Sequence, residues 1–131
     1  MINKNIIQFI VLAIILVVVD LPLLNISNQA KHFGKLIKKI QGTPMKINYI
    51  GAFFSYFFIT FALYYFIIRE NKSPTQAFLL GLTIYGVYEY TTYALISKWD
   101  FNTTIIDTLW GGLLFYICTH IYYFIQSNIK I

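Results

Sequence analysis

The hydrophobic residues of this chain are gathered into four long runs, and short polar links separate the runs. Each run approaches the roughly 20 residues that an α-helix needs to cross a bilayer. The runs cover Ile6–Leu24, Ile47–Ile68, Thr75–Ile96 and Thr103–Ile125. This pattern predicts an all-α integral membrane protein, in which residues 1–131 form a single transmembrane domain built as a four-helix bundle.

The longer link between the first two runs has the pattern of a short amphipathic helix at about residues 29–41. Its apolar residues fall on one helical face and its lysines on the rest. The apolar residues are Phe33, Leu36, Ile37 and Ile40, and the lysines are Lys31, Lys35, Lys38 and Lys39. Such a helix is typical of the membrane interface, where the lysines contact anionic lipid headgroups. The alternative is a basic connector that is merely solvated.

The composition also indicates a membrane protein. The chain is 58% hydrophobic and 11% charged, whereas about 25% of the residues in soluble domains are charged. The net charge of +5 indicates contact with lipid and not with nucleic acid, because the basic residues are split among loops without a nucleic-acid-binding motif. The lone Cys118 is expected to be an inert buried thiol, and no cofactor is expected.

The distribution of basic residues predicts the orientation of the helices. Four crossings place both termini on one side of the membrane. The side with the long link carries six basic residues and the terminal side four, so the positive-inside rule predicts a cytoplasmic link and external termini. The first run could also be a secretory signal, but its length favours a retained span. The sequence is compatible with a homo-oligomer.

Three acidic residues lie within the runs, where an unpaired carboxylate is costly. Asp20 lies four residues before the end of the first run, Glu89 seven before the end of the third, and Asp107 four after the start of the fourth. At 1.5 Å per residue, these positions are roughly 6 to 10 Å from one membrane face. The sequence therefore predicts that these carboxylates gather at a similar depth in one half of the membrane.

Hydroxyl and aromatic side chains on the third and fourth runs share helical faces with Glu89 and Asp107. Carboxylates with such neighbours suit a hard cation, a proton or an organic cation. No motif decides among these ligands, so the identity of any metal stays open. The candidate ligand- or ion-binding residues are Glu89, Asp107, Asp20, Tyr85, Thr92, Tyr93 and Trp110.

A structural interpretation of these acids carries similar weight. The two shallower acids could sit at headgroup depth, and Glu89 could be a hydrogen-bonded packing residue. His120 is expected to pack against its neighbours, and His32 to be exposed in the basic link. Trp99 is expected in the aromatic belt at the membrane interface.

Three functions follow from these features. The shared depth of the acids favours a transporter or channel-like protein that binds a proton or a cation. The basic amphipathic link favours a structural or assembly protein without transport activity. A membrane-embedded enzyme that uses the carboxylates is third, because the sequence contains none of the common enzyme motifs.

The chain resembles a known family over its whole length, including Asp20–Pro22 and Ile40–Met45, and one stretch carries most of the resemblance. Residues 85–95, followed by Trp99 and by Asp107–Gly111, are similar to a family of small predicted membrane proteins of unknown function found in bacteria and large DNA viruses. Members of that family read Tyr-x-x-Tyr-Asp-x-Thr-Asn-x-Ala-x-Leu, then a Trp, then Asp-x-x-Trp-Gly. This chain departs from the pattern with Glu89 in place of Asp and Thr92 in place of Asn. The resemblance implies a four-span fold and no established activity.

Overall fold

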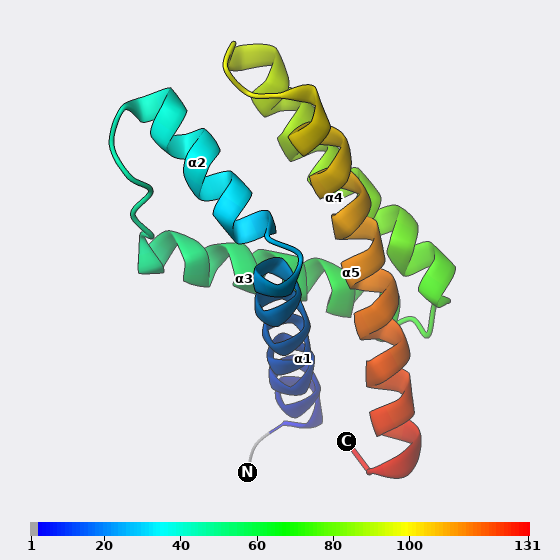
Figure 1. Cartoon of the computed structure of the whole chain (residues 1–131). Helices are drawn as coiled ribbons and strands as arrows, with labels where there is room; N and C mark the ends of the chain where they lie inside the picture. Colours follow the sequence, from blue (N-terminus) through cyan, green and yellow to red (C-terminus); the bar gives the residue numbers. More distant parts are fainter. Residues whose placement is uncertain (1–2) are drawn as a thin grey trace.

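The computed structural model describes residues 3–131, and every regular element within them is a helix (Figure 1). The helices are α1 (Lys4–Ile26), α2 (Gln29–Gln41), α3 (Tyr49–Leu63) with its π-helical continuation η1 (Tyr64–Ile68), α4 (Pro74–Leu95) and α5 (Phe101–Asn128). The all-α prediction is therefore confirmed. A helix also occupies the amphipathic link, and its position at a membrane surface stays a prediction.

Polar caps explain where α4 and α5 begin. Ser73 and Gln76 bond each other's backbone amides in a capping box, with Pro74 as the first helical residue of α4. At the start of α5, the carboxylate of Asp100 accepts a hydrogen bond of 3.1 Å from the backbone amide of Thr103. These caps satisfy amide groups that have no partner inside a helix, the first at the turn before α4 and the second at the turn between α4 and α5.

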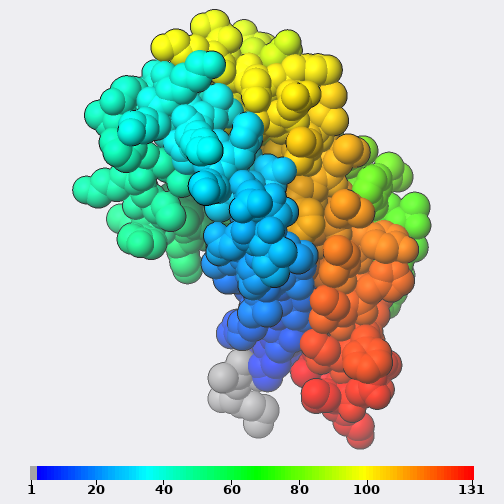
Figure 2. Space-filling model, viewed as in Figure 1, coloured from blue at the N-terminus to red at the C-terminus, as the bar shows by residue number. Residues whose placement is uncertain are grey.

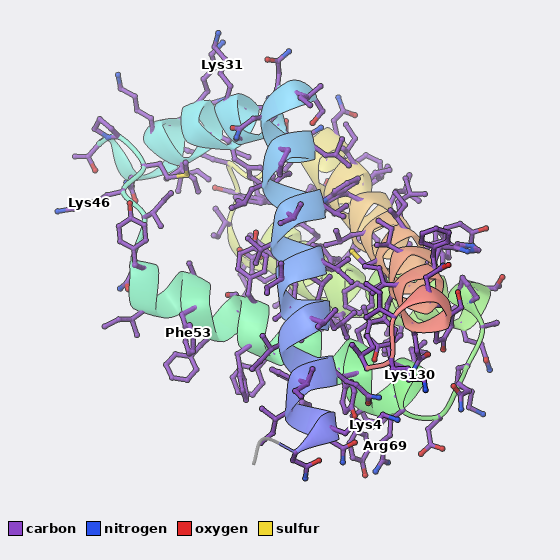
Figure 3. The ribbon with its side chains drawn as sticks, turned by 90° about the horizontal axis from the view of Figure 1, so that it is seen from below. Lys4, Lys31, Lys46, Phe53, Arg69 and Lys130 are labelled. Atoms are coloured by element: carbon purple, nitrogen blue, oxygen red, sulfur yellow. The ribbon has the colours of Figure 1, made fainter. Side chains whose placement is uncertain are left out.

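A residue with positive φ stands at each end of α2. Asn28 before the helix has a φ of 63°, and Gly42 after it has a φ of 79°. Glycine and asparagine adopt this conformation at lower cost than other residues, so the chain can turn sharply at both places. As a result, α2 runs sideways from the end of α1 (Figure 3).

Three helices in the described part of the chain are long and apolar enough to cross a bilayer, namely α1, α3 with η1, and α5. The 22 residues of α4 would extend about 33 Å at 1.5 Å per residue. However, Glu89 and several tyrosines and threonines make its second half more polar, so α4 does not reach the same apolarity. Of the four predicted spans, three therefore meet both criteria.

The most closely packed helices are α4 and α5, which run antiparallel (Figure 1). Glycines permit this approach, because a Cβ at Gly81 would collide with the carbonyl oxygen of Gly111. A Cβ at Gly112 would lie 2.8 Å from the ring of Phe78. Helix α1 packs against α5 and α3, whereas α3 runs across the direction of α1 in both Figure 1 and Figure 3. The structure thus consists of the close pair α4 and α5, with α1 packed against α5 and α3 packed against α1.

The core lies where α1, α3 with η1, α4 and α5 meet. Its fully buried large side chains include Leu12, Leu16, Leu63, Phe115 and Tyr122. Many other large apolar side chains, by contrast, are exposed, and Phe53 on α3 points away from the rest of the molecule (Figure 3). A bilayer would cover these exposed side chains, so the helices need no large internal core to bury them.

Candidate carboxylate cavity

A cavity of about 640 Å³ lies among α1, α3, α4 and α5. Its volume is in the range of known small-molecule sites. Most of the wall is apolar and aromatic, with side chains such as Phe54, Phe58, Ile59 and Ile84. The polar lining residues are Asp20, Ser55, Tyr56, Tyr85, Tyr88 and Asp107. The cavity therefore combines two carboxylates from different helices with tyrosine and phenylalanine rings.

Asp20 is held by donors from two other helices. The hydroxyl of Tyr56 on α3 donates to its Oδ2 at 2.6 Å, and the indole Nε1 of Trp110 on α5 donates to its Oδ1 at 2.8 Å. The side chain is buried, and a buried carboxylate requires such partners. Asp20 thus connects α1 to both α3 and α5 at the wall of the cavity.

Glu89 lies on α4 and has no exposed surface. The indole Nε1 of Trp99 donates to its Oε1 at 3.1 Å. Its Oε2, in contrast, has no hydrogen-bond partner among the described residues. Asp107, which lines the cavity, is a close acidic neighbour of this carboxyl group. Among residues 3–131 no N–H or hydroxyl donor reaches this oxygen, and the neighbouring carboxyl group of Asp107 can share a hydrogen bond with Glu89 only when one of the two acids is protonated.

The structure brings only some of the other candidate residues to the cavity. Tyr85 lines it, and Trp110 reaches Asp20. Thr92 instead donates its hydroxyl to a backbone carbonyl within α4, at 2.8 Å. Tyr93 is 42% exposed and lies beside the ring of Phe101. Neither Thr92 nor Tyr93 is part of the cavity wall.

Sequence reasoning did not include Tyr56, Ser55 or Tyr88 among the candidate binding residues, although all three line the cavity. Tyr56 lies in a run rich in phenylalanine, where aromatic residues are expected to face lipid. The signal that could have found it is its hydroxyl, because a tyrosine in an apolar segment requires a hydrogen-bond partner that phenylalanine does not. Trp99 differs from its expected place in the interface belt, since it is 5% exposed and donates to Glu89.

A second group of polar contacts lies where α2 meets the turn between α4 and α5. His32 Nε2 lies 2.8 Å from the hydroxyl of Thr103 and 3.6 Å from a carboxylate oxygen of Asp100. Burial raises the pKa of Asp100, but hydrogen bonds from Thr103 and the charge of His32 outweigh it and hold this pKa below its usual value. His32 is exposed as predicted, whereas His120, expected to pack, is also exposed, with its ring against Tyr116.

Within residues 3–131, no group of three His, Cys, Asp or Glu side chains is arranged to hold a metal ion. A cation in the cavity would therefore meet the carboxylates of Asp20 and Asp107 and complete its surroundings with hydroxyl oxygens, backbone oxygens or water. An organic cation would instead rest against the aromatic rings.

Residues 5–124 match the family described as Predicted membrane protein (DUF2177). The chain belongs to this family. The resemblance to a family of predicted membrane proteins of unknown function is thereby confirmed, and the motif and the range of organisms stay expectations. No curated protein and no solved structure matches the chain. Membership of DUF2177 agrees with the three span-length apolar helices, which make the chain a membrane protein with several apolar helices.

Proposed function

We propose that this DUF2177 protein is a small transporter or channel-like membrane protein that binds a proton or a cation at the carboxylate cavity. The observation that carries the proposal is the proximity of Asp107, in the cavity wall, to the buried Glu89 with its unpartnered Oε2. A proton or cation between the two carboxyl groups would supply the missing partner and offset their repulsion. Asp20 needs no such ligand, because both of its oxygens already accept hydrogen bonds.

The proposal includes α4 as a fourth span. Helix α4 packs along α5, a candidate span, so the two helices share one environment over much of their length. The side-chain amide of Gln8, near the start of α1, donates to the carbonyl of Ile131, just after α5, at 3.1 Å. The start of α1 and the end of α5 thus lie next to each other, which supports an even number of crossings. The higher basic count on the side of α2 favours a cytoplasmic α2 and external termini.

The packing between the cavity and the chain termini favours a binding site that is closed on the terminal side over a continuous pore. Toward the chain termini, the helices meet in the apolar core of Leu12, Leu63 and Phe115, which are completely buried. The polar side chains buried there, Thr60, Thr119 and Tyr122, are separated by these apolar residues and contain no acid, so they do not form a continuous path for an ion. The protein would therefore hold its ligand from one side of the membrane and release it to the other only after a change of conformation.

The test is cation binding by the detergent-purified protein, followed by flux in liposomes. Protons, sodium, potassium and tetramethylammonium are titrated separately, and thermal stability reports binding. Wild type is expected to show saturable stabilisation by at least one of these ions, and Asp107→Asn is expected to remove it. Asp100→Asn is the matched control, because it also neutralises an acid but lies outside the cavity wall.

Two results would count against the proposal. If Asp107→Asn binds every ion as wild type does, the cavity is not the site. If an ion binds and leaves with the expected dependence on Asp107 but no flux occurs in liposomes, the cavity is a binding site and the transport part of the proposal fails.

A structural or assembly role without transport is the second candidate. It is favoured by the exposed phenylalanines of α3, among them Phe53, Phe57 and Phe61, which could pack against another copy of the chain. Absence of any ion binding, together with a homo-oligomer detected by crosslinking in membranes, would favour this role.

A further inference from the structure

The outer face of α2 carries the strongest concentration of positive charge in the chain. Lys31, Lys35, Lys38 and Lys39 are all exposed, whereas Leu36 on the opposite face is buried. Helix α2 contains no acidic residue. Figure 3 shows Lys31 pointing away from the helices, at the end of the molecule opposite Lys4 and Lys130.

None of these four lysines has an ionic partner in the described part of the chain. The ion pairs there are His32 with Asp100 and Arg69 with Glu70. The charge on the outer face of α2 is therefore not neutralised within the protein. Four like charges along one short helix repel one another, so a surface of this kind gains stability from an external anion.

Helix α2 is attached to the membrane helices by contacts on its other side. His32 meets Thr103 of α5 at 2.8 Å, and the ring of Phe33 packs beside the ring of Trp99 with 6.0 Å between centroids. The ammonium group of Lys98 donates to the backbone carbonyl of Lys39 at 3.4 Å. Figure 2 shows α2 lying directly against the turn between α4 and α5. These contacts fix the position of the lysines at the ends of α4 and α5.

We propose that the lysine face of α2 is a binding surface for the phosphate headgroups of anionic lipids. This surface adjoins the ends of α1 and α4 and the start of α5, which is where lipid headgroups meet a membrane protein. Basic residues beside a membrane surface each gain roughly 1 kcal/mol from anionic lipid. The proposal is independent of the carboxylate cavity and holds whether or not the protein transports an ion.

Lipid fits the surface better than a soluble anionic partner. The partly buried residues Phe33, Ile37 and Ile40 follow the inner face of α2, so the lysines lie immediately above an apolar layer. A phospholipid offers the same order, with its phosphate group above its acyl chains. Nucleic acid or an acidic peptide offers charge without the apolar layer.

The experiment measures lipid retention by the detergent-purified full chain in native mass spectrometry. The probes are phosphatidylglycerol and phosphatidylcholine with identical acyl chains. Wild type is expected to retain phosphatidylglycerol in clear preference to phosphatidylcholine. K31Q/K35Q/K38Q is expected to bind phosphatidylglycerol roughly ten-fold more weakly, a screened fraction of the full effect of three lysines.

The matched control is K4Q/K72Q/K130Q, which removes the same charge from exposed lysines at the terminal end. It is expected to retain the wild-type preference for phosphatidylglycerol. Equal losses in both triple variants would overturn the proposal, because net charge and not the α2 surface would then set the preference. Displacement of phosphatidylglycerol by inorganic phosphate or polyglutamate at equal charge concentration would also overturn it, since a soluble anion would then suffice.

Discussion

Asp20 and Glu89 are both buried acids, the first in the wall of the cavity and the second behind its neighbour Asp107 in that wall, and they differ in their hydrogen-bond partners. Asp20 accepts two short hydrogen bonds, from Tyr56 at 2.6 Å and from Trp110 at 2.8 Å. Glu89 accepts one hydrogen bond of 3.1 Å from Trp99, and its other oxygen has no N–H or hydroxyl donor within residues 3–131. Both oxygens of Asp20 therefore accept a hydrogen bond from the protein, whereas only one oxygen of Glu89 does.

The difference separates a structural acid from a candidate functional one. A carboxylate with donors on both oxygens stabilises the packing of the helices that supply the donors. A carboxyl group with an empty oxygen, beside a second acid, remains costly until a proton or cation arrives. The two residues are thus distinguished by their hydrogen-bond partners.

The largest effect is expected on removal of the complete acid. Asp20→Ala leaves the hydroxyl of Tyr56 and the indole N–H of Trp110 buried without an acceptor, so the free energy of unfolding should fall by roughly 2–4 kcal/mol. Unfolding in a titration of sodium dodecyl sulfate measures the change. Tyr56→Phe removes only one of the two donors and should cost about half as much. An Asp20→Ala protein as stable as wild type would show that these hydrogen bonds contribute little to the fold.

An intermediate effect is expected from replacing each acid by its amide. Asp20→Asn weakens two charge-assisted hydrogen bonds and should cost about 1–2 kcal/mol. Glu89→Gln should change stability by less than about 1 kcal/mol, because its carbonyl oxygen can accept from Trp99 and its NH₂ group can donate toward Asp107.

The same pair of variants separates folding from function. Glu89→Gln should remove any stabilisation by protons or cations while leaving the protein folded, since it cannot bind a proton on its side chain or carry full charge. Asp20→Asn should lower stability but keep a response to the ligand. If Glu89→Gln is the more damaging change to stability and leaves the ligand response intact, the comparison between the two acids is reversed.

Sequence reasoning predicted most of the secondary structure, because helix formation here depends on local signals. The apolar runs of bilayer length and the polar links between them can be read directly from the sequence. The crossing of α3 over α1 was not predictable in the same way. It depends on how side chains of two helices fit together, and the glycines that let α4 approach α5 act through the shape of the facing helix.

The candidate site was predictable only in part. Counting residues from the ends of the runs grouped Asp20, Glu89 and Asp107; Asp20 and Asp107 line one cavity, whereas Glu89 is not among its lining residues. Helical periodicity also included Thr92 and Tyr93, which the rotation of α4 keeps away from the cavity wall. The donors to the acids could not be assigned from sequence. Tyr56 and Trp99 reach their acceptors across 36 and 10 residues of chain, and such contacts depend on the tertiary fold.

The smallest effect is expected at Asp100, which lies in the turn between α4 and α5. Like Asp20, its carboxylate has more than one partner, namely Thr103 and His32. Although burial raises its pKa, hydrogen bonds from Thr103 and the charge of His32 bring the pKa below the usual value. A lowered folded pKa means that the contribution to stability is present above the unfolded pKa of about 3.9 and is lost as pH falls through the folded pKa.

Asp100→Asn keeps the helix cap and should cost only a few tenths of a kcal/mol at pH 7. The gap in thermal stability between wild type and Asp100→Asn should therefore shrink as the pH falls from about 5 toward 3. A gap that stays constant over that range would show that the ionised carboxylate of Asp100 adds nothing to the fold.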